Sequence, residues 1–490
     1  MLIQDILKKS KEEDPEAVAI YTTDSYLTYE QLYNESVRLH LQLIQRKIER
    51  RKRIGIFFNN SPDFIIVFFA ILMSDCIAVP LPYNGNCNEI IRLINICDID
   101  IVLSKNTEEI SDHNWIITSR LNQDVVFGDG NSEYEEASTD PNEVAVLLAT
   151  SGTTSDPKVI QLSHRNIFTN SHAHANAIKL DKRDIFAVTM PLHFSSTLTT
   201  QLLSCIISRT TLALFELPLL PKKLIHHLNT IPVTCFACVP TTLKMLVNES
   251  QKKNITLSNT IHTIVVSGAA LEEEVYKLAQ LVFPRAKILQ TYGLSEASPR
   301  VSIMSRDDIS LSCGKAVEGV SIFVVRENGQ RCNYNEVGQI VVSGDNIMMG
   351  YYKNDEDTKK VIKDGELYTG DLGYLDEQER LFIVGRIKNI INVGGSNVYP
   401  EEIEQLLRNH PEISDVIVIG EEDTLLGEIP VAYVRLINNS TKISGIELKQ
   451  YLSNLLAPYK IPKHFYSVDE IQKTSTGKLI RRSIREKRQL

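Results

Sequence analysis

The stretch EVAVLLATSGTTSDPKVIQL occupies residues 143–162 and joins two apolar runs through a hydroxyl-rich loop. Its first run has the apolar pattern of a buried strand. The loop, residues 150–155, places five hydroxyl side chains around Gly152 and is followed by Pro157 and Lys158. It is too polar, and has too few packing side chains, for a core segment. We therefore expect a turn at the end of a rigid strand, followed by a helix capped by Ser163.

On both sides of this stretch, strand-like runs alternate with helical patterns. RIGIFF precedes an apolar helix at 63–73 and the run IAVPL, and TIVVSGA precedes LEEEVYKLAQLV. Such alternation indicates βαβ units and mostly parallel sheets. From about Ile322, shorter strands and turns predict a small barrel-like section. The predicted fold class is α/β, with a large N-terminal domain, this section, and a small mobile α+β C-terminal domain.

The length of 490 residues exceeds what one hydrophobic core normally serves, so two domains are expected. The predicted boundary lies in GRIKNIINVGG, residues 385–395, giving domains 1–388 and 389–490. In the second domain Pro400 occupies a first-turn helix position, and Ser444 with Glu447 forms a capping box.

The composition is that of an ordinary globular protein, with 43% hydrophobic and 23% charged residues. A net charge of −9 argues against binding to nucleic acid or anionic membranes. The apolar run at 64–73 is too short to span a bilayer and predicts a buried helix. No secretory signal is recognisable, and the eight cysteines have no framework spacing, so we expect a cytoplasmic protein with reduced thiols. Cys235 and Cys238 are expected to be core residues rather than a metal or redox pair.

Backbone N–H groups, hydroxyls and one lysine converging on a turn suit polyphosphate oxygens. The phosphate loop of mononucleotide-binding NTPases requires glycine, four residues, then Gly-Lys-Ser/Thr, which residues 150–158 lack. STGKL at 475–479 lacks the preceding glycine and fails the same test. Taken alone, the loop is as consistent with a Ser/Thr-rich surface loop as with a phosphate site.

Further motifs follow in a fixed order: QTYGLSEAS at 290–298, YTGDLGYLDEQERLFIVGRIKN at 368–389, GGSNVYPEEIE at 394–404 and KTSTGKLIRR at 473–482. In this order the set closely resembles the adenylate-forming superfamily, which holds acyl- and aryl-CoA synthetases, adenylation domains of nonribosomal peptide synthesis, and firefly luciferase. The resemblance covers essentially the whole chain. It implies activation of a carboxylic acid to acyl-AMP with release of pyrophosphate, then transfer to a thiol.

The resemblance implies roles for individual residues. The loop around the β,γ-phosphates of ATP would comprise Thr150, Ser151, Gly152, Thr153, Thr154 and Lys158. The adenine site would comprise Tyr292, Gly293, Gly268, Ala269 and Ala270, and Ser295 stands beside Glu296, the expected Mg²⁺ ligand. Asp371 would accept the ribose hydroxyls, with Arg386 nearby. Ser155 replaces the glycine usual in this part of the phosphate loop.

The chemistry explains why such residues are needed. A carboxylic acid is already ionised at pH 7 and needs no base, but it must approach a phosphorus surrounded by negative oxygens. Fixed positive charge lowers this barrier, and Lys478 with Mg²⁺ on Glu296 would supply it.

The second step requires a thiol, either of CoA or of the phosphopantetheine on a carrier protein. In relatives the small domain rotates, and here Gly394 and Gly395 would line the thiol channel. Asn389 stands at the hinge, where many relatives carry aspartate. The motif at 394–404 is more similar to CoA synthetases than to the peptide-synthesis domains.

Phe236 and Val239 are expected to border the acyl pocket. His193 is a candidate gate between the carboxylate site and the thiol channel, displaced by about one position from its counterpart in relatives. The run PLHFSSTL has no acidic side chain that could pair with a substrate ammonium, so an aliphatic or aryl acid is expected rather than an α-amino acid.

Two alternative functions are also consistent with the sequence. One is a luciferase-like enzyme that oxidises the adenylate with O₂. The other is a catalytically inactive member that acts as a binding protein, although the five charged positions Lys158, Glu296, Asp371, Arg386 and Lys478 are intact.

Overall fold

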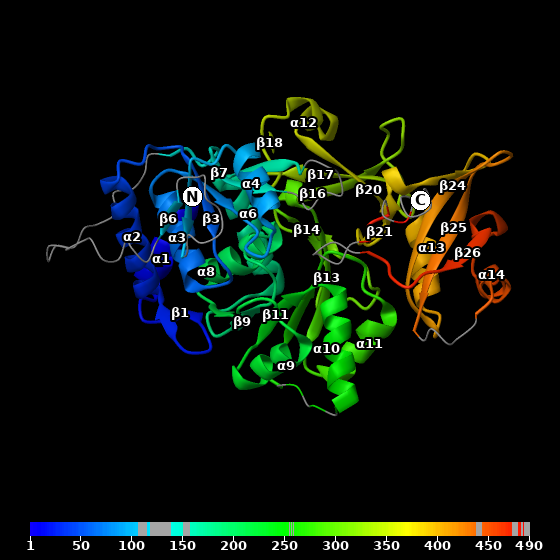
Figure 1. Ribbon diagram of the computed structural model, residues 1–490, viewed down its shortest axis with the longest axis horizontal. Helices are drawn as coiled ribbons and strands as arrows, with labels where there is room; N and C mark the ends of the chain where they lie inside the picture. Colours follow the sequence, from blue (N-terminus) through cyan, green and yellow to red (C-terminus); the bar gives the residue numbers. More distant parts are fainter. Residues whose placement is uncertain are drawn as a thin grey trace.

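The computed structural model describes residues 1–105, 115–117, 139–149, 157–253, 255, 257, 259–437, 443–472, 479–481 and 484. Two large, mostly parallel sheets form the greater part of the molecule, and two smaller sheets follow along the chain. Figure 1 shows the last sheet, orange to red, at one end of the long axis beyond β20 (Glu366–Leu375) and β21 (Leu381–Arg386).

The largest sheet has nine strands in the order β15-β14-β13-β12-β11-β9-β10-β1-β2. The six from β13 to β1 are parallel, and the strands at both edges are antiparallel. Their bounds are β1 (Val18–Tyr21), β2 (Tyr26–Thr28), β9 (Ile185–Val188), β10 (Thr211–Leu214), β11 (Cys235–Cys238), β12 (Thr263–Val266), β13 (Lys287–Gly293), β14 (Arg300–Ile303) and β15 (Lys315–Ala316).

The second sheet has the order β18-β8-β7-β4-β3-β5-β6, and it is parallel from β7 to β6. Its strands are β3 (Arg53–Phe57), β4 (Ile77–Pro80), β5 (Ile101–Ser104), β6 (Trp115–Ile117), β7 (Val144–Ala149), β8 (Val159–Ser163) and β18 (Gly350–Tyr351). β7 and β8 pair antiparallel with Ala149 opposite Val159, so the hydroxyl-rich loop joins two adjacent strand ends.

Helices cover both large sheets. Those of the N-terminal part are α1 (Ile3–Glu13), α2 (Tyr29–Gln45), α3 (Pro62–Met73), α4 (Cys87–Ile96), α6 (His164–Ile178), α7 (Ser195–Thr197), the π-helix η1 (Leu198–Leu203), α8 (Ser204–Ser208), α9 (Pro221–Thr230), α10 (Pro240–Lys253), α11 (Glu273–Val282) and α12 (Asp355–Val361). One core cluster joins α9, α10 and α11 to one face of the nine-stranded sheet, and a larger one fills the other face together with α1, α2 and α3.

Two local predictions are confirmed. The apolar run at 64–73 forms the buried helix α3, followed by the short strand β4. The Ser163 hydroxyl caps α6 by accepting from the backbone N–H of Asn166. No helix in the described ranges has the length and apolarity needed to cross a membrane.

The predicted barrel-like section is a five-stranded antiparallel sheet of β16 (Val320–Val325), β17 (Gly338–Gly344), β19 (Ile362–Lys363), β20 (Glu366–Leu375) and β21 (Leu381–Arg386). The last sheet contains β22 (Ile391–Val393), β23 (Ser396–Val398), β24 (Ile413–Asp423), β25 (Gly427–Leu436) and β26 (His464–Ser467). Its helices are α13 (Pro400–Arg408) and α14 (Gly445–Ser453), and both predicted helix starts, Pro400 and the Ser444–Glu447 capping box, are confirmed. The predicted α/β class, with a large N-terminal part and a smaller C-terminal unit, is confirmed.

Candidate active site

Several predicted site segments follow directly after neighbouring parallel strands of the nine-stranded sheet. They therefore lie side by side at the carboxyl ends of these strands. His193 follows β9, Val239 follows β11, residues 268–270 follow β12, and residues 292–296 close β13 and begin the next turn. In open α/β sheets, ligands bind beyond this edge of the strands. Four segments that are distant in the sequence therefore meet where a ligand is expected.

A tight turn at residues 293–298 holds Glu296, the acidic residue of the SEAS motif (residues 295–298), at the end of β13. The backbone reverses after Gly293, where a Cβ atom would lie 2.0 Å from the carbonyl oxygen of Pro299. The short 3₁₀ helix η2 (Ser295–Ala297) follows, and Ser298 takes a left-handed conformation with φ 64°. Only glycine leaves room for this reversal, which holds Glu296 at the strand end.

Asp371 lies in β20 directly opposite Arg386 in β21 and is the centre of a three-residue group. Its Oδ1 forms an ion pair with Arg386, with 2.8 Å between Oδ1 and Nε, and its Oδ2 accepts a hydrogen bond from the Tyr292 hydroxyl at 2.7 Å. The carboxylate is buried, and its backbone N–H donates to the Thr369 hydroxyl. Burial, reinforced by Asp371, raises the pKa of Tyr292, so the phenol remains a hydrogen-bond donor.

A carboxylate offers about four acceptor positions on its two oxygens. Tyr292 and Arg386 each occupy one at Asp371, which leaves acceptor capacity on both oxygens. The group therefore presents a buried, oriented anion that can still accept hydroxyl donors.

Glu296 and Lys158 are joined by a residue that the sequence did not indicate. The Tyr351 hydroxyl donates to Glu296 Oε1 at 3.0 Å, and Lys158 Nζ lies 4.6 Å from the centre of the Tyr351 ring. Lys158 also pairs with Asp357 of α12, with 3.0 Å between Nζ and Oδ2. Burial, reinforced by Glu296, raises the pKa of Tyr351 and keeps its proton available.

Tyr351 is positioned by β18, which pairs with β8 so that Tyr351 lies opposite Ile160, two residues after Lys158. A main-chain bond from Met348 N to the carbonyl oxygen of Glu296, at 2.9 Å, ties the same segment to the SEAS turn. Lys158 and Glu296 thus come together through a strand from a third part of the chain. Neither Tyr351 nor Asp357 lies in one of the motifs identified from the sequence.

Ser295 faces the segment that carries His193. Its hydroxyl lies 2.7 Å from the hydroxyl of Ser195, which begins α7. His193 is half-buried against Phe194, and burial lowers its pKa to about 4. Its imidazole is therefore neutral at pH 7.

Some predicted residues lie elsewhere or outside the described part of the chain. Thr150, Ser151, Gly152, Thr153, Thr154, Ser155 and Lys478 are not among the described residues. Phe236 is fully buried, with its ring centre 5.8 Å from that of Phe283, in the core beneath α9, α10 and α11. Side chains alternate across a strand, so Phe236 points to this helix-covered face rather than to the strand end occupied by Val239.

The predicted thiol-channel and hinge residues lie near the start of the C-terminal sheet. Gly394 (φ 57°) and Gly395 (φ 84°) form the two-residue turn between β22 and β23, where both central residues need positive φ. Asn389 ends the 3₁₀ helix η3 (Ile387–Asn389) and donates from Nδ2 to Glu401 Oε1 at 2.6 Å. Arg481 donates to the same oxygen at 3.0 Å, which links the end of the chain to the predicted hinge.

Comparison with protein-family models gives two matches. Residues 7–352 match the AMP-binding enzyme model, and residues 402–478 match the AMP-binding enzyme C-terminal domain. The second match extends to Lys478 and includes the STGK segment.

Curated relatives align over nearly the full chain. The 4-coumarate–CoA ligase 2 of Nicotiana tabacum is 28% identical over 94% of this chain and 89% of its own length. The 2-succinylbenzoate–CoA ligase of Bacillus subtilis is 27% identical over 97% and 96%, and the long-chain-fatty-acid–CoA ligase of the same organism is 28% identical over 99% and 94%. All three are CoA ligases.

Solved structures with a similar fold belong to the same class of enzyme. The o-succinylbenzoate CoA synthetase of Bacillus subtilis, bound to its acyl-adenylate intermediate, superimposes with a TM-score of 0.88 at 26% identity over 98% of this chain and 97% of that chain. The same synthetase bound to ATP and magnesium gives 0.87 at 26% identity, covering 98% and 99%. The resemblance predicted from the motifs is confirmed, and the chain belongs to the AMP-binding enzyme family.

Proposed function

We propose that this protein is an ATP-dependent, AMP-forming ligase that joins a carboxylic acid to the thiol of CoA. The observation that carries this proposal is Asp371, a buried carboxylate oriented by Tyr292 and Arg386 with acceptor positions still available. Such a group fits the two hydroxyls of a ribose, and it lies with Glu296 and Lys158 around the strand ends. The relatives named above are CoA ligases, which supports the same assignment.

We assign the binding of ATP to the following residues. The loop at 150–155 and Lys158 would hold the β,γ-phosphates, which leave as pyrophosphate. The ring of Tyr292 and the segment 268–270 would flank the adenine, and Asp371 would accept from the ribose. Arg386 is half-exposed, so it can keep its bond to Asp371 while it reaches a phosphate oxygen.

Glu296 is suited to hold Mg²⁺. Its carboxylate is half-buried, and Tyr351 holds one of its oxygens in place. Mg²⁺ prefers oxygen ligands such as this carboxylate, and its other coordination positions would be filled by water and phosphate oxygens. When bound, the ion would neutralise negative charge on the phosphate oxygens.

The reaction then needs positioning and charge rather than a general base. The acid is ionised at neutral pH and attacks the α-phosphorus, and pyrophosphate departs. Lys478, which lies at the end of the C-terminal family match, would place its ammonium between the carboxylate and the α-phosphate.

The acid itself is expected to be aliphatic or aryl. Residues 189–201 contain no acidic side chain, so the ammonium of an α-amino acid would be desolvated without a partner, at a cost of several kcal/mol. Val239 and the neutral His193 would border the acyl group and the passage to the thiol.

We propose a division into domains 1–388 and 389–490, with rotation about Asn389 for the thiol step. The bond from Asn389 to Glu401 of α13 supports a hinge that is coupled to the small domain. Gly394 and Gly395 are exposed and carry no side chains, which suits close approach of a narrow pantetheine arm. We place the enzyme in the cytoplasm, with CoA favoured over a carrier protein as acceptor.

The test is ATP–pyrophosphate exchange over a panel of carboxylic acids, followed by parallel trapping with CoA and with holo carrier proteins. We expect exchange with an aliphatic or aryl acid and thioester formation with CoA. Transfer to a carrier protein alone would revise the acceptor, and O₂-dependent consumption of the adenylate would favour a luciferase-like enzyme. Absence of exchange with every acid would refute the ligase assignment.

The variant Lys478→Ala should lose about 10²–10³-fold or more in exchange rate with the fold retained. Lys473→Ala, in the same segment, is the matched control and should retain activity. Equal exchange rates in the two variants would remove Lys478 from the reaction.

A further inference from the structure

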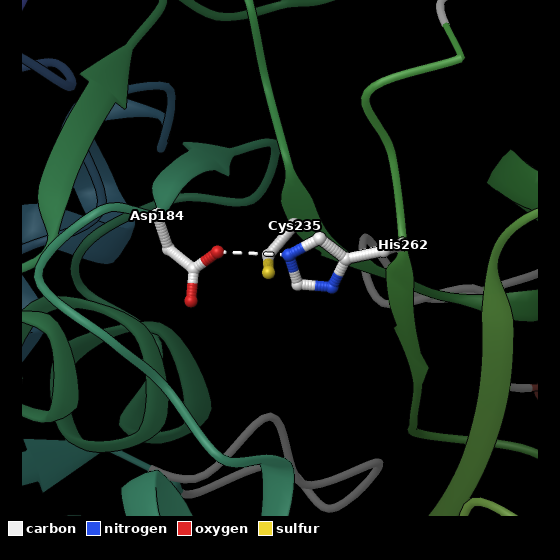
Figure 2. A group of neighbouring side chains, drawn as sticks. All are labelled: Asp184, Cys235 and His262. Atoms are coloured by element: carbon white, nitrogen blue, oxygen red, sulfur yellow. Dashed lines mark hydrogen bonds and ion pairs between the residues drawn. The ribbon is translucent and has the colours of Figure 1, made fainter.

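Asp184, Cys235 and His262 gather at the edge of the nine-stranded sheet opposite to the candidate active site (Figure 2). Asp184 directly precedes β9, Cys235 begins β11, and His262 directly precedes β12. These strands are adjacent in the sheet, and one ligand atom from each residue lies within 4.8 Å of the others. Each strand has four residues, so roughly 13 Å of sheet separates the cluster from the nucleotide edge.

We propose that this cluster binds a divalent transition-metal ion of the zinc class. One carboxylate oxygen, one thiolate sulfur and one imidazole nitrogen form a ligand set that Zn²⁺ accepts, with a fourth position left for water. The charge of Zn²⁺ is balanced by one carboxylate and one thiolate, so the buried site would hold no uncompensated charge. Asp184 and Cys235 are buried, whereas the His262 side chain is 41% exposed and provides the side of entry.

The Asp184 carboxylate is already oriented by the surrounding chain. Its Oδ2 accepts from the backbone N–H of Asp181 at 2.9 Å, and its Oδ1 accepts from the Thr234 hydroxyl at 2.8 Å. Outer partners of this kind fix the direction of a metal ligand and are a regular feature of metal sites.

His262 has an outer partner as well. Its Nδ1 lies 2.9 Å from the Thr263 hydroxyl, which also accepts from Arg306 at 2.8 Å. The hydroxyl can donate to Nδ1 or accept from it, so it supports either tautomer of the imidazole. Nε2, 2.8 Å from Asp184 Oδ1, is the nitrogen that faces the cluster.

Binding of the metal would release the proton of the Cys235 thiol and shift the imidazole proton of His262 from one ring nitrogen to the other. In the metal-free state that we propose, Nε2 carries the imidazole proton and faces Asp184 Oδ1, and burial raises the pKa of the Cys235 thiol to about 12. On binding, the imidazole proton moves to Nδ1 and is donated to Thr263, the Cys235 proton passes to solvent, and metal–oxygen, metal–sulfur and metal–nitrogen bonds form. One proton is released per ion, so affinity should rise about tenfold per pH unit.

The nitrogen–oxygen pair of the cluster requires only a small adjustment, and the Cys235 sulfur lies within 4.8 Å of both atoms. Zinc–nitrogen and zinc–oxygen bonds of roughly 2.0–2.2 Å at a tetrahedral angle separate the two ligand atoms by about 3.3 Å. The present distance between Nε2 and Oδ1 is 2.8 Å, and His262 is exposed enough to move by the difference. Arg306 opposes a cation, but it also favours the thiolate form of Cys235.

Titration of the full-length protein with Co²⁺, without nucleotide and with a non-thiol reductant, tests the proposal. We expect a sulfur-to-cobalt charge-transfer band that saturates at one equivalent, is displaced by Zn²⁺, and strengthens with pH. Cys235→Ser should abolish the band, and His262→Gln should weaken binding by at least about tenfold.

Cys238→Ser and His226→Gln are matched controls, because they change a buried cysteine of the same strand and an exposed histidine outside the cluster. Both should retain the band. A wild-type protein without the band, or a Cys235→Ser protein that keeps it, would overturn the proposal. Should Cys235→Ser fail to fold, equal affinities in the folded His262→Gln and His226→Gln variants would overturn it as well.

Discussion

The polar contacts around Asp371 predict how the enzyme should respond to a ribose that lacks one hydroxyl. Of roughly four acceptor positions on the carboxylate, Tyr292 and Arg386 occupy two. The remaining two match the 2′- and 3′-hydroxyls of ATP in number. A hydrogen bond to a charged acceptor contributes about 1.5–3 kcal/mol. Since 1.4 kcal/mol is a factor of ten, the loss of one hydroxyl should lower kcat/KM by roughly 10- to 150-fold.

The perturbation is Asp371→Asn, assayed by pyrophosphate exchange with ATP and with 2′-deoxyATP. The amide keeps the shape of the side chain but removes its charge and one acceptor oxygen. We expect the variant to lose most of its activity with ATP and to treat the two nucleotides nearly alike. The wild-type enzyme should discriminate between them by the factor given above.

Asp376→Asn is the matched control, because Asp376 also lies by the β20–β21 hairpin and pairs with an arginine, Arg380. It should keep the wild-type preference for ATP. If Asp371→Asn keeps that preference as well, the assignment of Asp371 to the ribose is refuted, whatever its total activity.

Three further predictions follow from buried or charged contacts. Arg481→Met should destabilise the C-terminal unit by about 1.5–3 kcal/mol in denaturant unfolding, because it removes one of the two arginines, Arg481 and Arg408, that pair with the buried Glu404. Adding Glu404→Leu should recover part of this loss, and additive losses would contradict the coupling. Lys158→Met should lower the rate of pyrophosphate exchange by about 10²–10³-fold. It should change the free energy of unfolding by under ~1 kcal/mol, since the ion pair of Lys158 with Asp357 is partly exposed. An exchange rate equal to that of the wild-type enzyme would exclude a contact of Lys158 with the phosphates of ATP. The pKa of His164 is lowered to about 4 by burial, while the unfolded chain protonates near 6.5, so the free energy of unfolding should fall by up to about 1.4 kcal/mol per pH unit as pH drops between these values. His164→Gln should flatten this slope, because Nδ1 accepts from Ile3 N only when unprotonated.

Local signals in the sequence predicted local structure well. The caps at Ser163 and Ser444, the apolar helix α3 and the helix start at Pro400 depend on residues within a few positions of one another. The motif order also indicated the family, and with it the expectation that Asp371 and Arg386 belong to one site. Their pairing across adjacent strands agrees with that expectation.

Contacts between distant segments had no such signal. Tyr351 joins Glu296 to Lys158 only because β18 returns to pair with β8. Phe236 belongs to the core because strand alternation turns it toward α9, α10 and α11, which no short window reveals.

The sequence by itself determined the family, the order of elements and the residues available for adenylate chemistry, because these follow from periodicity and contiguous motifs. Only the tertiary structure decided which side chains meet. Cys235 was expected to be an ordinary core cysteine, and it is buried, yet sheet order places Asp184 and His262 beside it. Three strand starts from separate parts of the chain become neighbours through crossover connections, and that adjacency is a property of the sheet rather than of any one segment.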